Sequence, residues 1–218
     1  PRTVASFYEE LMRHLRELGF SLTIHGAPNE VENAIPFAED NEHASYDPEY
    51  ANRFWRILVD THRVFTVFRA GFTGKVSPVH FFWGSFDLAL TRFSGRRAPP
   101  HPGGFPNMPD WITREAYSHE VASMGFWPGG PASPAPAFYA YAYPVPEGLG
   151  AEPVEPAGAF YSEEMREYFL PYEAMRKTPD PDHALQRFLE TTYDAITRKA
   201  YWDRNSLDSP RGFPRAPR

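Results

Sequence analysis

The chain has 218 residues, a formal net charge of −6 and no cysteine. Without cysteine it forms no disulfide, zinc–thiolate site or iron–sulfur cluster, and its acidic balance argues against a general nucleic-acid binder. No apolar run approaches the roughly 20 residues needed to cross a bilayer, and no signal-peptide apolar core is present. We therefore expect a cytoplasmic protein without membrane contact.

Three amphipathic helices are predicted from apolar residues that recur at spacings of three and four, the periodicity of one helix face. Their expected ranges are about 3–18, 48–71 and 181–202. The second and third begin with an Asp-Pro pair, at Asp47 and Asp180, in which the carboxylate caps the helix and proline occupies its first turn. The apolar stripes predict helices that pack on a core.

Between the second and third helices, the chain changes to runs rich in aromatic and β-branched residues, separated by stretches rich in proline and glycine. The runs predict strands, and the separating stretches predict long ordered loops between them. The expected strands cover residues 76–93, 112–124 and 137–143, with a short additional one at 21–25. The sequence therefore predicts an α+β fold, in which an antiparallel sheet of long aromatic-rich strands is flanked by about three amphipathic helices.

A candidate acid–base site comes from the second of the longer strands, because alternate side chains of a strand share a face. Glu115, Tyr117 and His119 then lie in line, and an imidazole oriented by a carboxylate suits proton transfer near neutral pH. His80 and Asp87 of the preceding strand complete the predicted catalytic set, although a regular strand puts these two on opposite faces unless a bulge at Gly84 changes the alternation. We expect His119 as base, oriented by Glu115 or Asp87. The alternative is a structural hydrogen-bond network.

Candidate substrate-binding groups lie on the same strands and on the loop before the second helix. They are Trp83, Ser85, Arg92, Tyr141 and His43. Tyr141 is the middle one of three tyrosines on one face of the third strand, which form an aromatic wall with polar tips. Either Tyr141 or Tyr117 would serve as proton donor. Arg92 would hold an anionic group and His43 would form a rim over the cleft, and a solvated position is the alternative for both.

Metal and nucleotide sites have weaker support. A transition metal held across strands by His80 and His119 is one alternative, with Glu115 or Asp87 as the next ligand. None of the eight histidines falls in the HxH or HExxH spacing that marks a metal site in a sequence. No GxxxxGK[ST] or GxGxxG motif indicates a nucleotide site.

Seven strings of residues carry a resemblance to a known family: 43–48, 74–87, 91–96, 114–120, 125–129, 138–144 and 202–204. They resemble the signature of a bacterial family called domain-of-unknown-function family 5996, over essentially the whole chain up to its last residues. The resemblance implies that typical members extend further at the front with a β-rich segment, so that this chain corresponds to their C-terminal two-thirds. It implies no reaction, substrate or cofactor.

One domain is expected over residues 1–204, lacking that preceding segment and followed by a flexible tail at 205–218. Two function classes remain open. The first is a small-molecule enzyme or binder, in which His, carboxylate and Tyr side chains in an aromatic-lined polar cleft perform acid–base chemistry. The second is a non-catalytic structural or interaction module that packs on another chain, in a homo-oligomer or against the preceding segment. Charged groups within the aromatic strands favour the first class, because the core of an interface is depleted in charge.

Overall fold

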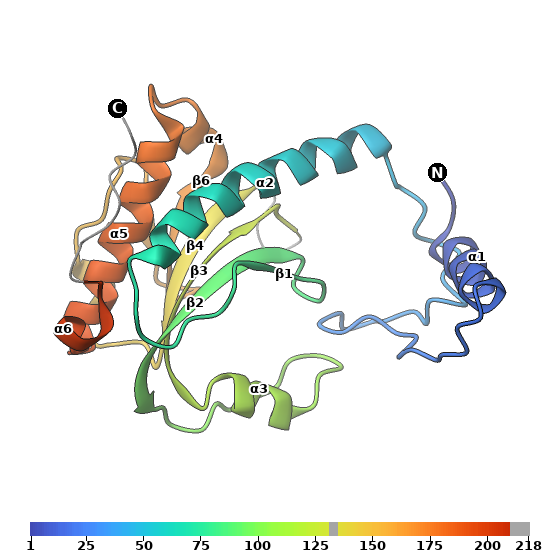
Figure 1. The fold of residues 1–218 in the computed structure, drawn as a ribbon, viewed down its shortest axis with the longest axis horizontal. Helices are drawn as coiled ribbons and strands as arrows, with labels where there is room; N and C mark the ends of the chain where they lie inside the picture. Colours follow the sequence, from blue (N-terminus) through green and yellow to red (C-terminus); the bar gives the residue numbers. More distant parts are fainter. Residues whose placement is uncertain (131–134, 210–218) are drawn as a thin grey trace.

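The structure, a computed structural model, describes residues 1–130 and 135–209. In this part of the chain, six strands form one antiparallel sheet in the order β1-β2-β3-β4-β6-β5 (Figure 1). The strands are β1 (His80–Phe82), β2 (Asp87–Arg97), β3 (His119–Trp127), β4 (Ala137–Tyr143), β5 (Phe160–Ser162) and β6 (Glu167–Pro171). The predicted α+β fold, an antiparallel sheet flanked by helices, is confirmed.

The described chain also contains three long helices and several short ones. They are α1 (Val4–Glu17), α2 (Pro48–Ala70), α3 (Asp110–Ala116), the 3-10 turn η1 (Leu149–Ala151), α4 (Tyr172–Arg176), α5 (Pro181–Lys199) and α6 (Arg204–Leu207). The three predicted helices are confirmed, and so are both carboxylate caps. Asp47 accepts the Glu49 N–H at 2.8 Å, and Asp180 accepts the His183 N–H at 3.0 Å. None of the described helices is long and apolar enough to span a membrane.

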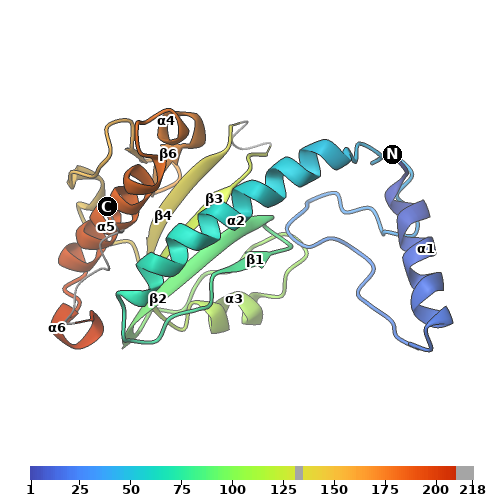
Figure 2. The same cartoon turned by 45° about the horizontal axis from the view of Figure 1, so that its top comes forward.

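Helices α2 and α5 cover one face of the sheet, as Figures 1 and 2 show. Alternate strand residues such as Leu90, Met124 and Phe138 are fully buried in the core between this face and the helices. Phe68 of α2 and Tyr193 of α5 belong to the same core and make a T-shaped ring contact, with ring centroids 6.0 Å apart. The core therefore uses every second residue of the central strands and leaves the others for the opposite face.

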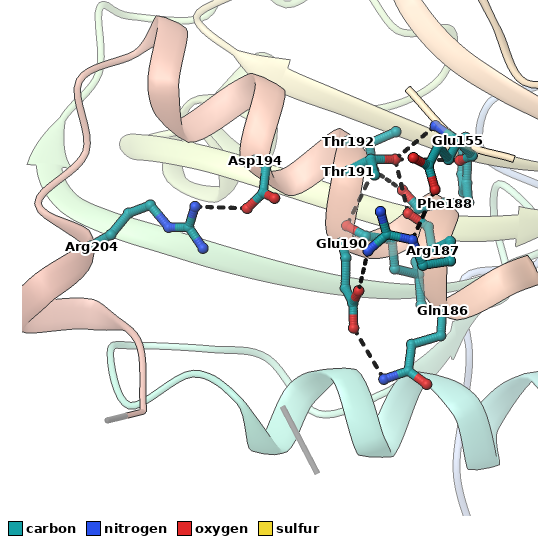
Figure 3. A network of polar contacts seen from close by, with 10 residues as sticks. Glu155, Gln186, Arg187, Phe188, Glu190, Thr191, Thr192, Asp194 and Arg204 are labelled. Atoms are coloured by element: carbon teal, nitrogen blue, oxygen red, sulfur yellow. Dashed lines mark hydrogen bonds and ion pairs between the residues drawn. The ribbon is translucent and has the colours of Figure 1, made fainter. Parts of the chain in front are cut away.

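A polar network on the solvent-exposed side of α5 holds the loop that follows η1 (Figure 3). The Arg187 guanidinium donates to Glu155 of that loop at 2.9 Å and to Glu190 at 3.0 Å. A separate ion pair joins Arg204 of α6 to Asp194 at 2.6 Å. Exposed pairs of this kind contribute about 0–1 kcal/mol each, so they fix the position of the loop more than they stabilise the fold.

The strand expected at 76–93 is a hairpin. β1 and β2 pair antiparallel across the turn at 83–86, with Phe82 opposite Asp87. The prediction of one continuous strand was wrong because the chain reverses at this turn, where Phe86 adopts a left-handed conformation with φ of 59°. Two successive aromatic runs read as one strand when the turn between them also contains aromatic residues.

The other strand predictions are correct in part. Residues 137–143 form β4 as expected. The prediction for 112–124 was wrong at its start, because α3 occupies 110–116 and β3 begins only at His119. The prediction at 21–25 was wrong: this segment runs as a loop away from the sheet and has no strand to pair with in the described chain. The short strands β5 and β6 were not predicted.

Residues 1–46, the N-terminal arm, lie to one side of the sheet (Figure 1). α1 is held by the loop that follows it, since the Val4 N–H donates to the His43 carbonyl at 3.0 Å. No residue of α1 is buried, and its apolar side chains remain accessible, with Phe7 58% and neighbouring Leu18 73% exposed. The arm thus presents an amphipathic helix whose apolar side the following loop covers only in part.

The first residues of the expected tail pack on the sheet domain. The Leu207 carbonyl accepts the Thr73 N–H at 2.7 Å, and the Asp208 carboxylate accepts the Tyr193 hydroxyl at 2.7 Å. The remaining tail residues, 210–218, lie outside the described residues. The described part of this segment is therefore bonded both to the end of α2 and to α5.

Candidate functional site

The second face of the sheet, away from α2 and α5, has a different composition from the first. Ala89 and Phe169 lie at its centre together with a group of residues that we call the polar face: Asp87, Thr91, Ser123, Gly125, Tyr139, Tyr141 and Glu167. Thr91 pairs in register with Ser123, which pairs with Tyr141, and the Thr91 and Ser123 hydroxyls are hydrogen-bonded at 2.9 Å. Each central strand thus has an apolar side in the core and a polar side here, as alternation requires.

Tyr139 crosses from β4 over β3 to reach β2. Its ring lies above Gly125, where an added Cβ would clash with the ring and the phenolic oxygen. The Tyr139 hydroxyl donates a hydrogen bond to Oδ2 of Asp87. Only a residue without a side chain leaves this path open, so Gly125 allows a hydroxyl from one strand to reach a carboxylate two strands away.

Asp87 is a buried carboxyl with part of its hydrogen-bonding capacity unused. The residue is 7% exposed, and its Oδ1 accepts no hydrogen bond from another residue. Burial raises the pKa of Asp87, and the Tyr139 hydroxyl opposes this shift. Glu30 raises the same pKa further, whereas His80 lowers it. A buried polar atom without a partner costs about 1–3 kcal/mol, so a ligand that donates to Oδ1 would be stabilised.

Glu167, at the start of β6, is the second acid of the polar face. Burial, reinforced by the charge of Asp87, raises the pKa of Glu167 to about 7. Burial also raises the pKa of Tyr139 and of Tyr141 well above the usual value, with Glu167 adding to both shifts. At neutral pH the carboxyl of Glu167 can therefore donate or accept a proton, while the two tyrosines remain neutral hydrogen-bond donors.

Aromatic rings border the polar face near the end of α3. The Tyr117 and Tyr141 hydroxyls share a hydrogen bond of 2.8 Å. His101 stacks on Tyr117 with ring centroids 4.7 Å apart, and its ring lies 4.9 Å from that of Tyr143. Burial lowers the pKa of His101, which favours the neutral imidazole. The carboxyls of this face thus lie beside an aromatic wall with polar tips.

A segment of the N-terminal arm reaches the sheet beside Asp87. Glu30 accepts a hydrogen bond of 2.8 Å from the Ser85 hydroxyl in the β1–β2 turn. The Glu30 N–H donates to the Pro106 carbonyl at 2.9 Å, in the loop before α3. The arm is therefore attached to two loops at once, and it brings a third carboxyl close enough to raise the pKa of Asp87.

Four of the predicted site residues meet on the polar face or along its border: Asp87, His80, Tyr117 and Tyr141. The hairpin explains the place of His80, which pairs with Ala89 and therefore points to the same side as Asp87. A regular strand would have put these two residues on opposite faces, but the chain turns between them and resets the alternation.

Arg92, predicted to hold an anionic group, lies on the opposite side of the sheet. It is fully buried, and its guanidinium carbon lies 3.6 Å from the ring centroid of Phe68 and 4.3 Å from that of Tyr193. Burial lowers the pKa of Arg92 to about 10. The structure therefore places this side chain in the core between the sheet and the helices, away from the polar face.

Glu115 and His119 are not brought together. Their predicted alignment on one strand was wrong, because Glu115 is exposed on α3 whereas His119 is the first residue of β3. Nδ1 of His119 contacts the Ser118 hydroxyl at 3.2 Å, and His119 pairs in register with Arg97 at the far end of β2. The predicted orientation of this imidazole by Glu115 therefore has no counterpart in the fold.

The three remaining candidates lie at the periphery. Trp83 is 82% exposed in the β1–β2 turn, and Ser85 of the same turn is bonded to Glu30. His43 belongs to the N-terminal arm, where its Nδ1 lies 2.9 Å from the Asp40 carboxylate. Of the three, Ser85 comes nearest to the polar face, through its contact with the arm.

Sequence reasoning missed Glu167 and Glu30. Glu167 opens a five-residue strand, and its only signal was the short aromatic run Glu167–Pro171, in which Tyr168 and Leu170 alternate into the core. Glu30 lies in an irregular loop and its neighbours in the sequence give no indication of its place beside Ser85, 55 residues away.

Other sites on the molecule offer less specific chemistry. A surface hollow of about 570 Å³ lies where β3 and β4 meet the end of α5, and one of its two acids, Glu120, is paired with Arg96 at 2.7 Å. A second hollow, of about 610 Å³, lies between α1 and the following loop. Within residues 1–130 and 135–209, no three His, Cys, Asp or Glu side chains are grouped as metal ligands. The predicted transition-metal alternative therefore gains no support from the geometry.

The comparisons with known proteins agree with the resemblance seen in the sequence. No curated protein and no solved structure matches the chain at a significant level. A family model described as "Family of unknown function (DUF5996)" matches residues 1–209. Since this match covers nearly all of the sequence, the chain belongs to this family of unknown function.

Proposed function

We propose that the polar face binds a small molecule and exchanges a proton with it. One observation carries the proposal: Oδ1 of Asp87 is buried without a partner, beside a second carboxyl whose pKa is about 7. A purely structural network would pair that oxygen, because an unpaired buried acceptor costs about 1–3 kcal/mol. A hydrogen-bond donor on a ligand completes the arrangement.

Each group has a distinct role in this proposal. Glu167 takes or gives the proton, since a carboxyl with a pKa near the working pH is efficient in both directions. Tyr139 stays neutral and holds Oδ2 of Asp87, which leaves Oδ1 for the ligand. Tyr117 or Tyr141 donates a hydrogen bond to the ligand and keeps its own proton, while Glu167 replaces His119 as the base.

The test is a thermal-shift screen of the whole chain at pH 7 against metabolite mixtures and metal salts. A true ligand raises the melting temperature of the wild type by mass action. We expect Asp87→Asn to lose most of that shift, because the neutral amide turns an acceptor into a partial donor. The matched control is Asp60→Asn, the same chemical change on the exposed side of α2.

Two outcomes would contradict the proposal: no shift with any compound class, or an undiminished shift in an Asp87→Asn protein that retains the wild-type circular dichroism spectrum. A variant that fails to fold is replaced by Tyr139→Phe, which removes only the hydroxyl that holds Oδ2. Loss of the ligand shift in that variant would again support the site.

A second candidate function, a non-catalytic interaction module, is favoured by the N-terminal arm. α1 has no buried residue, and Phe7 and Leu18 are largely exposed. Such a helix suits packing against another chain, including a second copy of this one. Light scattering after size exclusion tests this function: a dimer that becomes monomeric in Leu18→Gln would support it, and a wild-type monomer at all concentrations would exclude self-association.

A further inference from the structure

We propose that the polar face takes an organic cation, a molecule with a protonated or quaternary nitrogen next to an apolar part. The inference rests on the proposed function and names the ligand class of the same site. It follows from three features of the described residues: the sign of the charges, the unpaired oxygen of Asp87 and the rings beside it.

Two carboxyls, Glu30 and Glu167, and one imidazole, His80, are the charged groups that interact with Asp87. Glu30 acts on Asp87 as a further negative charge, and His80 as a positive one. Asp87 also acts on Glu167. In the part of the chain that the structure describes, neither Asp87 nor Glu167 forms an ion pair with a lysine or arginine, and Arg92 of the same strand is buried on the opposite side. A cation is therefore the partner that this group of carboxyls lacks.

Asp87 supplies the directional contact. Its Oδ1 is buried and accepts no hydrogen bond from another residue, while Oδ2 is held by the Tyr139 hydroxyl. A nitrogen that carries a proton would donate to Oδ1 and form a charge-assisted hydrogen bond, which is stronger than a neutral one. A hydrogen-bond acceptor on the ligand would face the Asp87 oxygen, which is also an acceptor, and would be repelled unless the Asp87 carboxyl were protonated.

The aromatic rings supply the rest of the site. Tyr139 and Tyr141 are stacked with an interplanar angle of 22° and ring centroids 6.0 Å apart, and Tyr117 lies 6.4 Å from Tyr141. Ring faces attract cations, and the combination of rings with a carboxylate suits a cation attached to an apolar group. A metal ion fits less well, because residues 1–130 and 135–209 contain no group of three carboxylate or imidazole ligands.

Binding of a cation would release protons. Glu167 is half protonated near pH 7, and a positive charge close by would favour its ionised form. The groups that interact with Glu167 are Asp87 on β2, Tyr117 after α3, Tyr139 and Tyr141 on β4, and Tyr161 on β5. The tyrosines remain neutral at this pH, so Glu167 dominates the exchange. We expect up to about half a proton released for each cation bound at pH 7, whereas an anion would cause uptake.

The experiment uses probes matched in shape and different in charge. Choline is compared with its neutral isostere 3,3-dimethylbutan-1-ol, and benzylamine is compared with benzyl alcohol and benzoate, each at millimolar concentration with the full chain. Binding is mapped by amide chemical-shift changes at Asp87, Tyr139 and Glu167. Proton release is measured by isothermal titration calorimetry in two buffers that differ in ionisation enthalpy.

We expect the cations to change the amide chemical shifts of the polar face. The neutral and anionic probes should bind with an affinity at least about tenfold lower. Asp87→Asn should weaken cation binding about tenfold, Glu167→Gln should abolish the proton release, and Asp60→Asn should change neither. Equal or tighter binding of the neutral or anionic probes would overturn the cation inference and leave the proposed function standing. Absence of binding by every probe would overturn both.

Discussion

Replacement of Glu167 by glutamine should make the protein more stable at alkaline pH. The pKa of Glu167 is raised from 4.5 to about 7 in the fold, so the folded chain holds this proton more tightly than the unfolded chain does. The stability that the protonated carboxyl contributes is complete below about pH 4.5 and is lost as the pH rises to about 7. Glutamine has the shape of the protonated acid and does not ionise, so Glu167→Gln escapes this loss.

The size of the effect follows from the same shift. One unit of pKa corresponds to about 1.4 kcal/mol, so the shift of Glu167 corresponds to a loss of about 3 kcal/mol between acid and alkaline pH. At pH 8 we expect the free energy of unfolding of Glu167→Gln to exceed that of the wild type by up to about 3 kcal/mol. At pH 5 we expect the two values to differ by less than about 1 kcal/mol. Urea unfolding followed by tryptophan fluorescence measures both values, and the slope m checks that unfolding remains comparable.

Glu164→Gln provides the matched control, because Glu164 is exposed in the turn before β6 and undergoes the same loss of charge. Its stability difference from the wild type should stay within about 0.5 kcal/mol at both pH values. The reasoning is refuted if Glu167→Gln and the wild type lose stability in parallel between pH 5 and pH 8. It is also refuted if the control gains as much as Glu167→Gln.

Three further predictions concern packing and the N-terminal arm. Gly125→Ala should lower the free energy of unfolding by about 1–3 kcal/mol, because the new methyl group displaces the Tyr139 ring, and an unchanged urea midpoint would show that the ring does not lie there. Ser85→Ala should lower the free energy of unfolding by less than about 1 kcal/mol, but it should accelerate hydrogen exchange at the Glu30 amide because it releases the arm from the hairpin. Unchanged exchange at this amide would speak against the attachment. Arg92→Ala should lower the free energy of unfolding by about 3–5 kcal/mol, and Arg92→Met should lower it clearly less, because methionine fills the space between the rings without a charge. Equal losses of the two variants in urea unfolding would argue against a packing role.

The sequence predicted well those elements whose signals are local. The helices that begin at Pro48 and Pro181 each carry a capping aspartate and a regular apolar stripe, and both signals act within a few residues. β4 was predicted with the correct bounds because small and aromatic residues alternate over residues 139–143 and another aromatic precedes them. Local patterning of this kind requires no knowledge of the rest of the fold.

The site depends on pairing between distant segments, which the sequence does not reveal. Asp87 and Tyr141 were candidates from their residue types and neighbours, but whether they share one face of the sheet depends on the register of three strands. Glu167 reaches the same face from a strand too short to recognise, and Glu30 reaches it from an irregular loop through contacts with residues far away in the sequence. His119 shows the converse error: a suitable residue type in a strand was given a partner, Glu115, that belongs to a helix.

The absence of a side chain at Gly125 has an evolutionary consequence. This position offers no functional group, yet the space above it decides whether a phenol from the next strand can hold the buried acid of β2. Selection on the hydrogen bonding of Asp87 therefore acts on a residue that has no chemistry of its own. Among relatives, a larger residue at the position of Gly125 should be accompanied by a smaller one at the position of Tyr139, and the two positions should vary as a pair.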